Sequence, residues 1–207
     1  HLVTVRKEGD PAVSRAIAMG KKAHQMILDA LAALTAEDEN AARRVIAADD
    51  AVDYDFNAIK HTLAQEIAAD PGKVDAALDL LMVIKYLERI GDHAMNIAEY
   101  TRNMKKWDIS FSDDARTEIK KMKQVSMNIL DVIDFTDATT PAAQLETISK
   151  YEFLMDDMEK KYRKRQIKRA KKGDCKAESG ILFSELLTDF ERIGDYALNI
   201  GELHADM

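Results

Sequence analysis

The 207-residue chain has little of the residues that make turns, disulfides and aromatic cores. It contains 8 Gly, 3 Pro and 1 Cys, and 6% of its residues are aromatic. So few turn-forming residues exclude the many tight connections of an all-β fold. The single Cys175 cannot form an internal disulfide, which fits a reducing cytoplasm. No uncharged apolar run approaches the roughly 20 residues of a membrane-spanning helix.

What is abundant is charge, with an acidic excess. The chain has 37 acidic and 30 basic residues, a formal net charge of −7, and both halves are acidic. Overall positive potential steers proteins to nucleic acid, so this balance argues against a nucleic-acid partner. The chain begins with His1 instead of Met, and a tag remnant, a processed start and the cut edge of a longer protein are all compatible with that.

One segment is basic. Nine of the thirteen residues from Lys160 to Lys172 are Lys or Arg. One interpretation is a solvated helix end whose cations complement the carbonyl end of the helix. The other is a docking patch for an anionic partner, including peripheral contact with a membrane surface.

An internal repeat organises the chain. The twelve residues Glu88–Glu99 recur at Glu191–Glu202, with nine identities and an offset of 103. The same offset carries Asp49 onto Glu152, Asp53 onto Asp156 and Met19 onto Met122. We therefore predict one unit of about 100 residues used twice, with domains at 1–106 and 107–207.

Each unit has the apolar periodicity of three long helices. The predicted fold is all-α, two tandem three-helix bundles joined near Trp107. In the first unit the helices are expected at about 12–34, 37–69 and 73–105. The expected boundary signals are Thr35–Asp38 as a capping-box-like start, Asp70–Gly72 as a stop, Ser112 or Ser110 as a cap, Thr139–Pro141 as a start and Gly173–Asp174 as a separator.

Carboxylates lie where these helices should be buried. Glu88, Asp92, Asn96 and Glu99 form one acidic stripe at the edge of an apolar helix face, at about 100° per residue. Asp49 and Asp53 share the apolar face of the preceding helix. Facing pairs of buried carboxylates repel unless a cation lies between them. Oxygen ligands suit magnesium, manganese, calcium or iron. The second unit repeats the pattern with Glu152, Asp156, Glu191, Asp195, Asn199 and Glu202.

An alternative interpretation needs no metal. The carboxylates are then protonated or paired with Arg89 and Arg192, and the motif repeats because it packs helices. Gly91 and Gly194, which occupy equivalent positions, support close helix approach, because a glycine inside a helix costs about 1 kcal/mol relative to alanine.

The segments Leu87–Glu99 and Phe190–Glu202 resemble the signature of the PhoU family of phosphate-uptake regulators, and Val45–Asp53 is similar to the family's second-helix motif. The resemblance implies polynuclear metal, often iron, with zinc, manganese, magnesium or calcium as alternatives. The pairs that it implies as ligands are Asp49/Asp53, Glu88/Asp92, Glu152/Asp156 and Glu191/Asp195, with Asn96, Glu99, Asn199 and Glu202 nearby.

The same resemblance implies a cytoplasmic, non-enzymatic and homo-oligomeric regulator, such as a dimer. Its expected partners are a phosphate transporter component or a sensor kinase at the inner face of the membrane. The second unit is also similar to the module that follows the membrane domain of sodium/phosphate cotransporters, so a regulatory domain cut from such a transporter is an alternative.

Two other functions are compatible with a repeated acidic bundle. A carboxylate-bridged metalloenzyme is one, although di-iron bundles usually add Glu-x-x-His, which neither stripe contains. A scaffold that only oligomerises is the other, and it predicts that neutralising the carboxylates leaves stability unchanged or raised.

Overall fold

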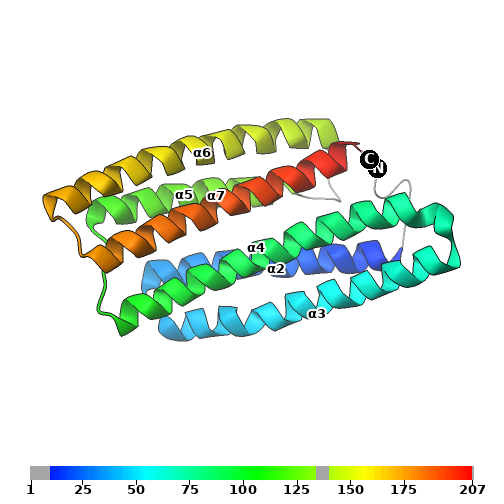
Figure 1. The fold of residues 1–207 in the computed structure, drawn as a ribbon, viewed down its shortest axis with the longest axis horizontal. Coiled ribbons are helices and arrows are strands. Elements are labelled where there is room, and N and C mark those ends of the chain that lie inside the picture. Colours follow the sequence, from blue (N-terminus) through cyan, green and yellow to red (C-terminus); the bar gives the residue numbers. More distant parts are fainter. Residues whose placement is uncertain (1–9, 134–139, 207) are drawn as a thin grey trace.

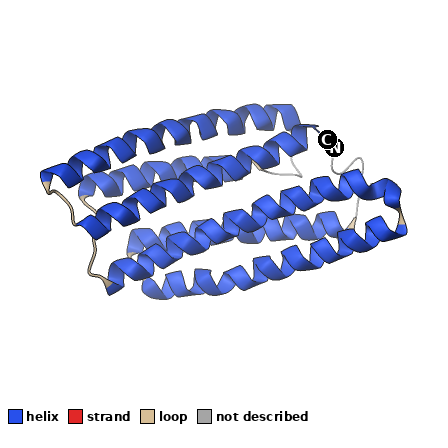
Figure 2. Ribbon diagram, viewed as in Figure 1, coloured by secondary structure: helices blue, strands red, loops and turns tan. Residues whose placement is uncertain are grey.

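The structure, a computed structural model, describes residues 10–133 and 140–206 (Figure 1). Throughout those residues the regular structure is helical, as Figure 2 shows. The helices are α2 (Pro11–Ala36), α3 (Glu39–Ala69), α4 (Val74–Lys106), α5 (Asp113–Val132), α6 (Pro141–Lys172) and α7 (Ala177–Asp206), with a short 3₁₀ turn η1 (Pro71–Lys73). The predicted all-α fold is confirmed.

The six long helices form two three-helix bundles lying side by side (Figure 1). Helices α2, α3 and α4 pack on one another, and so do α5, α6 and α7. The bundles meet mainly along α4 and α7, which run in opposite directions (Figure 1). Within the described residues, no helix is both long and apolar enough to cross a membrane.

Equivalent positions of the two repeats are buried. Met19 and Met122, which the 103-residue offset relates, are both fully inaccessible to solvent. The pairs Leu80/Phe183, Leu87/Phe190, Ile90/Ile193, Ala94/Ala197 and Ile97/Ile200 are also buried. The repeat in the sequence is therefore a repeat of core positions.

Most predicted helix ends agree with the structure. Ser112, and not Ser110, caps α5, because its Oγ accepts the Ala115 N–H at 3.3 Å. Thr140 caps α6 with Pro141 as its first residue, and Thr139 lies outside the described residues. Gly173 ends α6 with a φ of 76°, in the left-handed region that favours glycine.

The predicted capping box at Thr35–Asp38 is wrong. Thr35 is still part of α2, and its hydroxyl donates to the carbonyl of Leu31 at 2.7 Å. Helix α2 ends at Ala36, and Glu37 caps its carboxyl end with a φ of 53°. Asp38 is the cap of α3, because its Oδ1 accepts the N–H groups of Asn40 at 2.9 Å and Ala41 at 3.0 Å.

Related residues make the contacts between α4 and α7. His93 Nδ1 lies 2.5 Å from Asp189 Oδ1, and Tyr86 stacks on Tyr196 with ring centroids 5.8 Å apart. The offset of 103 relates His93 to Tyr196 and Tyr86 to Asp189. The two contacts are therefore the same pair of positions used in both directions across an approximate two-fold axis.

Candidate metal centres

The first acidic cluster consists of Asp49 and Asp53 on α3 and Glu88 and Asp92 on α4. Asp49 is half-buried, and burial, then repulsion from Asp53 and Asp92, raises its pKa to about 6. Burial and Glu88 also raise the pKa of Asp92. The two helices thus hold like charges close enough to disfavour full ionisation.

Gly91 lets α4 approach this cluster. A Cβ atom on Gly91 would lie 3.4 Å from Asp49 Oδ1 and 3.4 Å from Val52 Cγ1. At Gly194 the nearest atom would be Met155 Cγ at 3.7 Å. The close approach predicted from the repeated glycine is found at Gly91, where it brings the α4 backbone next to a carboxylate, whereas a Cβ on Gly194 would make only ordinary van der Waals contact.

Asp53 corrects the expectation that both α3 carboxylates lie on the buried face. Asp53 is exposed, whereas Asp49 is half-buried and Val52 is fully buried. Four residues advance about 40° around a helix. Asp49 already lies at the rim of the apolar face, so that advance carries Asp53 outward to solvent.

The second acidic cluster consists of Glu152 and Asp156 on α6 and Glu191 and Asp195 on α7. Ligand atoms of Glu152, Asp156 and Asp195 all lie within 4.8 Å of one another. Burial is the main reason that the pKa values of Glu152, Glu191 and Asp195 are raised, and neighbouring carboxylates add to it. Three carboxylates at this separation fit one hard cation held by oxygen ligands.

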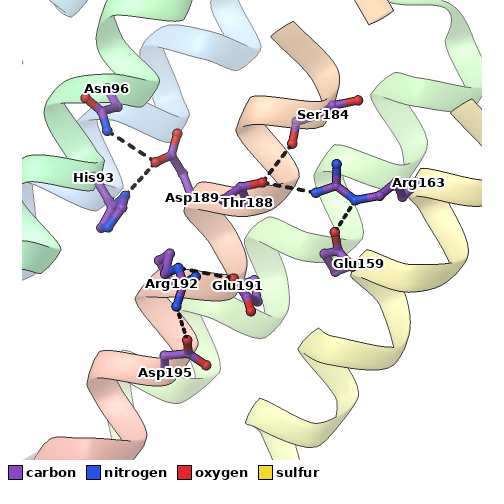
Figure 3. Close-up of polar contacts among 10 residues, drawn as sticks. All are labelled: His93, Asn96, Glu159, Arg163, Ser184, Thr188, Asp189, Glu191, Arg192 and Asp195. Atoms are coloured by element: carbon purple, nitrogen blue, oxygen red, sulfur yellow. Dashed lines mark hydrogen bonds and ion pairs between the residues drawn. The ribbon is translucent and has the colours of Figure 1, made fainter. Parts of the chain in front are cut away.

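Nearby cations pair with several of these carboxylates. In the first cluster, Lys85 Nζ lies 2.6 Å from Glu88 Oε2, and Arg89 Nη1 lies 3.5 Å from Asp92 Oδ2. In the second, Figure 3 shows Arg192 between Glu191 and Asp195, at 3.6 Å and 3.1 Å. Lys160 Nζ pairs with Asp156 at 2.9 Å. The metal-free interpretation therefore accounts for these carboxylates.

It does not account for Asp49 and Glu152. No described Lys or Arg lies within ion-pair distance of either side chain, although both are half-buried and both have raised pKa values. The offset of 103 relates these two residues. Each repeat thus keeps one half-buried carboxylate without an ion-pair partner at the same place, and a bound cation would have its largest effect there. Lys160 offsets part of the rise in the pKa of Glu152.

The described helices also match known proteins. A family model described as the PhoU domain matches residues 17–101 and 119–203. The chain belongs to the PhoU family. Both acidic clusters lie inside the matched PhoU repeats, in the α3–α4 and α6–α7 pairs.

Among curated relatives, the PhoU homolog 1 of Thermotoga maritima, a phosphate-specific transport system accessory protein, is 29% identical over 182 residues, which cover 84% of this chain and 75% of that protein. The PhoU homolog of Caulobacter vibrioides is 44% identical over 95 residues, which cover 44% of this chain and 41% of that protein.

Crystal structures of PhoU from Pseudomonas aeruginosa and Streptococcus pneumoniae have the same fold, with TM-scores of 0.82 and 0.78. Both are 21% identical and cover 93% of this chain, and the chain covers 92% and 90% of them. At this identity the similarity shows the PhoU fold and carries no ligand set.

The remaining predicted ligands lie away from the carboxylate pairs of the PhoU repeats. Asn96 Nδ2 donates to Asp189 Oδ1 at 3.3 Å, beside His93 (Figure 3). Glu99 is exposed and lines a different pocket with Arg102. In the second repeat Asn199 is half-buried and Glu202 is exposed. Asn96 lies about 40° further around α4 than Asp92, whereas Glu99 lies within about 20° of Asp92 but about 10 Å further along the helix axis.

Sequence reasoning missed two deeply buried carboxylates of this PhoU chain. Asp55 pairs with Arg15 at 3.1 Å and Lys22 at 2.6 Å, and these two cations, opposing burial, lower its pKa. Glu118 pairs with Arg165 at 3.2 Å and Arg169 at 2.8 Å. Neither lies in a repeated motif, and their partners come from other helices, so no local pattern identifies them.

The basic segment Lys160–Lys172 is only partly free for a partner. Four of its nine cations pair with carboxylates, and these are Lys160, Arg163, Arg165 and Arg169. The other five are exposed and have no carboxylate of the described chain within ion-pair distance, and these are Lys161, Lys164, Lys168, Lys171 and Lys172. Ile167, between them in the sequence, is 50% exposed.

Proposed function

We propose that this chain is a non-enzymatic regulator of phosphate transport that binds cations on its two acidic clusters. The observation that carries the metal part is the pair of uncompensated, half-buried carboxylates, Asp49 and Glu152, at equivalent positions of the PhoU repeats. The regulatory part is supported by family membership and by the similarity to curated relatives that are phosphate-specific transport system accessory proteins.

The side chains present suit such cations. The second cluster offers Glu152, Asp156 and Asp195 to one ion, and Glu191 lies next to it. The first offers Asp49, Glu88 and Asp92 with Asp53 at the solvent side. A bound cation would stabilise the ionised carboxylates and compete with Lys85 and Arg192 for them. Iron is the first expectation, with zinc, manganese, magnesium and calcium as alternatives.

Elemental analysis of the purified protein tests the metal sites. We expect stoichiometric metal in the natural sequence, a partial loss in Asp49→Asn or Glu152→Gln, and near-complete loss in the double variant. The matched controls are Asp50→Asn and Asp157→Asn, which remove an exposed carboxylate next to each cluster and should leave the metal content unchanged. Stoichiometric metal that survives the double variant would contradict the proposed ligands.

The partner is proposed to be a phosphate transporter component or a sensor kinase at the cytoplasmic face of the membrane. Crosslinking in cells of the source organism, followed by mass spectrometry, should recover one of these proteins, and the yield should change between high and low phosphate. Recovery of neither under both conditions would overturn the regulatory proposal. Sedimentation of the purified protein tests the predicted homo-oligomer.

The five unpaired lysines support peripheral contact with an anionic membrane. Each basic residue close to such a surface contributes about 1 kcal/mol. Vesicles of phosphatidylcholine with phosphatidylserine should therefore sediment the protein, and pure phosphatidylcholine should not. Lys164→Gln with Lys168→Gln should weaken this binding, whereas Lys105→Gln with Lys120→Gln removes equal charge elsewhere and serves as the control.

A further inference from the structure

A pocket of about 340 Å³ lies between the start of α3 and the end of α4, apart from both acidic clusters. All its lining side chains are polar or charged, and these are Glu39, Arg43, Glu99, Arg102, Asn103 and Lys106. Their spacings of three, four and seven residues place them on one stripe of each helix, so the two stripes face each other. The volume falls in the range of roughly 300–1,000 Å³ that is typical of small-molecule sites.

The pocket is locally positive in an acidic chain. Three cations and two carboxylates line it, whereas the chain as a whole has a net charge of −7. Glu39 Oε1 forms an ion pair with Arg43 Nη2 at 2.6 Å. The remaining carboxylate, Glu99, faces two further cations, Arg102 and Lys106.

Arg102 contributes a donor that the described residues leave unused. The Arg102 Nε is buried and has no hydrogen-bond partner among the residues that the structure describes. Buried donors are nearly always satisfied, so such an atom marks a place where an acceptor belongs. The guanidinium fork of Arg matches the paired oxygens of an oxyanion.

The second repeat shows that these cations are not needed for the fold. The 103-residue offset relates Arg43 to Glu146 and Arg102 to Ala205, so the equivalent place there has neither arginine. Both bundles nevertheless form the same three-helix arrangement. Lys106 also lies in the last turn of α4, where it complements the carbonyl end of the helix, so the two arginines carry the argument.

We propose that this pocket binds a small oxyanion of the phosphate class, either inorganic phosphate or the phosphoryl group of a small metabolite. The guanidinium of Arg102, which lines the pocket and whose Nε has no other partner among the described residues, donates to the oxyanion, while Arg43 and Lys106 supply positive charge. This site does not depend on metal in the acidic clusters, so either proposal can fail alone.

Titration calorimetry on the EDTA-treated 207-residue chain tests the pocket, because removing metal prevents phosphate from binding through a cation. We expect saturable binding of inorganic phosphate, of glycerol phosphate, or of both, and the tighter ligand identifies the source. Arg102→Gln and Arg43→Gln should each weaken that binding by about tenfold or more, equivalent to about 1.4 kcal/mol. Arg43 is exposed, so its variant tests the site even if Arg102→Gln folds poorly.

Lys105→Gln is the matched control, because Lys105 is exposed, adjoins the pocket residue Lys106 and does not line the pocket. It removes the same charge and should change affinity less than twofold. Equal weakening by Lys105→Gln and Arg43→Gln would mean non-specific attraction and would overturn the site, as would absence of saturable binding of both ligands.

Discussion

The two acidic clusters occupy equivalent positions in the two repeats, yet their carboxylates are arranged differently. In the second repeat Glu152 reaches Asp156 and Asp195, and their oxygens converge within 4.8 Å. In the first repeat Asp49, which is one methylene shorter than Glu152, lies next to Gly91, and burial and the neighbouring carboxylates raise its pKa to about 6. Three carboxylates thus gather around one point in the second cluster, whereas among the described residues no such convergence is found in the first.

The largest expected difference between the repeats concerns their cores. Phe183→Ala should lower the free energy of unfolding by about 4 kcal/mol and Leu80→Ala by about 3 kcal/mol, because both side chains are buried and Phe183 is the larger. Denaturant unfolding followed by circular dichroism measures both. We expect one transition that shifts as a whole, since α4 packs on α7. Two separate transitions would show that the repeats unfold independently.

The second-largest difference in stability is expected between the two contacts that join α4 and α7 across the approximate two-fold axis. His93→Gln takes away the ring nitrogen that lies 2.5 Å from Asp189, which is 4% exposed, and should cost about 1.5–3 kcal/mol. Tyr196→Phe preserves the stacked ring against Tyr86 and should cost less than about 1 kcal/mol. Thermal unfolding of both variants tests this ranking, and equal losses would contradict it.

Asp49 should give metal-free protein a pH-dependent loss of stability. Its pKa of about 6, against 3.8 ordinarily, means that the folded state binds the proton more tightly than the unfolded chain. Stability therefore falls as pH rises from about 4 to about 6 and levels off above that. After solvent screening of a half-exposed group, the loss is about 1–2 kcal/mol.

Asp49→Asn should remove that pH dependence and raise metal-free stability at pH 7. Glu152→Gln should act in the same direction, because burial and neighbouring carboxylates also raise the pKa of Glu152, although Lys160 opposes them. Urea unfolding between pH 4 and pH 8 measures both. With metal bound, the sign should reverse, and a stabilising effect that persists in metal-loaded protein would contradict the ligand role of Asp49.

The smallest effect on the free energy of unfolding is expected from the half-exposed arginines beside the two acidic clusters. Arg192 lies 3.1 Å from Asp195 and Arg89 lies 3.5 Å from Asp92, and both arginine side chains are about half exposed. Arg192→Gln and Arg89→Gln should each cost about 0.5 kcal/mol or less, and the cost should shrink at high salt. Thermal unfolding at low and high ionic strength checks both.

Much of the fold follows from local sequence. The repeat at 103, the helix-forming composition and the caps at Ser112, Thr140 and Gly173 predict the helices and their grouping. The misassigned boundary at Thr35–Asp38 shows the limit of such signals, because two candidate caps lie three residues apart. The choice depends on Glu37 entering the left-handed region, which no spacing rule requires.

The candidate metal centres could be predicted only in part from the sequence, for a related reason. Glu88, Asp92 and Asp195 follow from the repeated motif, and Asp156 follows from the same offset of 103, since helical spacing fixes which face such residues share. The exposure of Asp53 and the pairing of Asn96 with Asp189 depend on where the neighbouring helix lies. A rotation of about 40° decides each of them, which is close to the uncertainty of a face read from sequence.

The sequence by itself determined that this chain consists of two copies of one PhoU-type helical unit, because a fixed offset, nine identities in twelve and helical periodicity are local properties. Only the tertiary structure decided which charges are compensated. The partners of Asp55, Glu118 and Asp189 come from distant helices, whereas Asp49 and Glu152 receive none among the described residues. Ion pairing depends on distances between helices, and those are set by packing rather than by spacing along the chain.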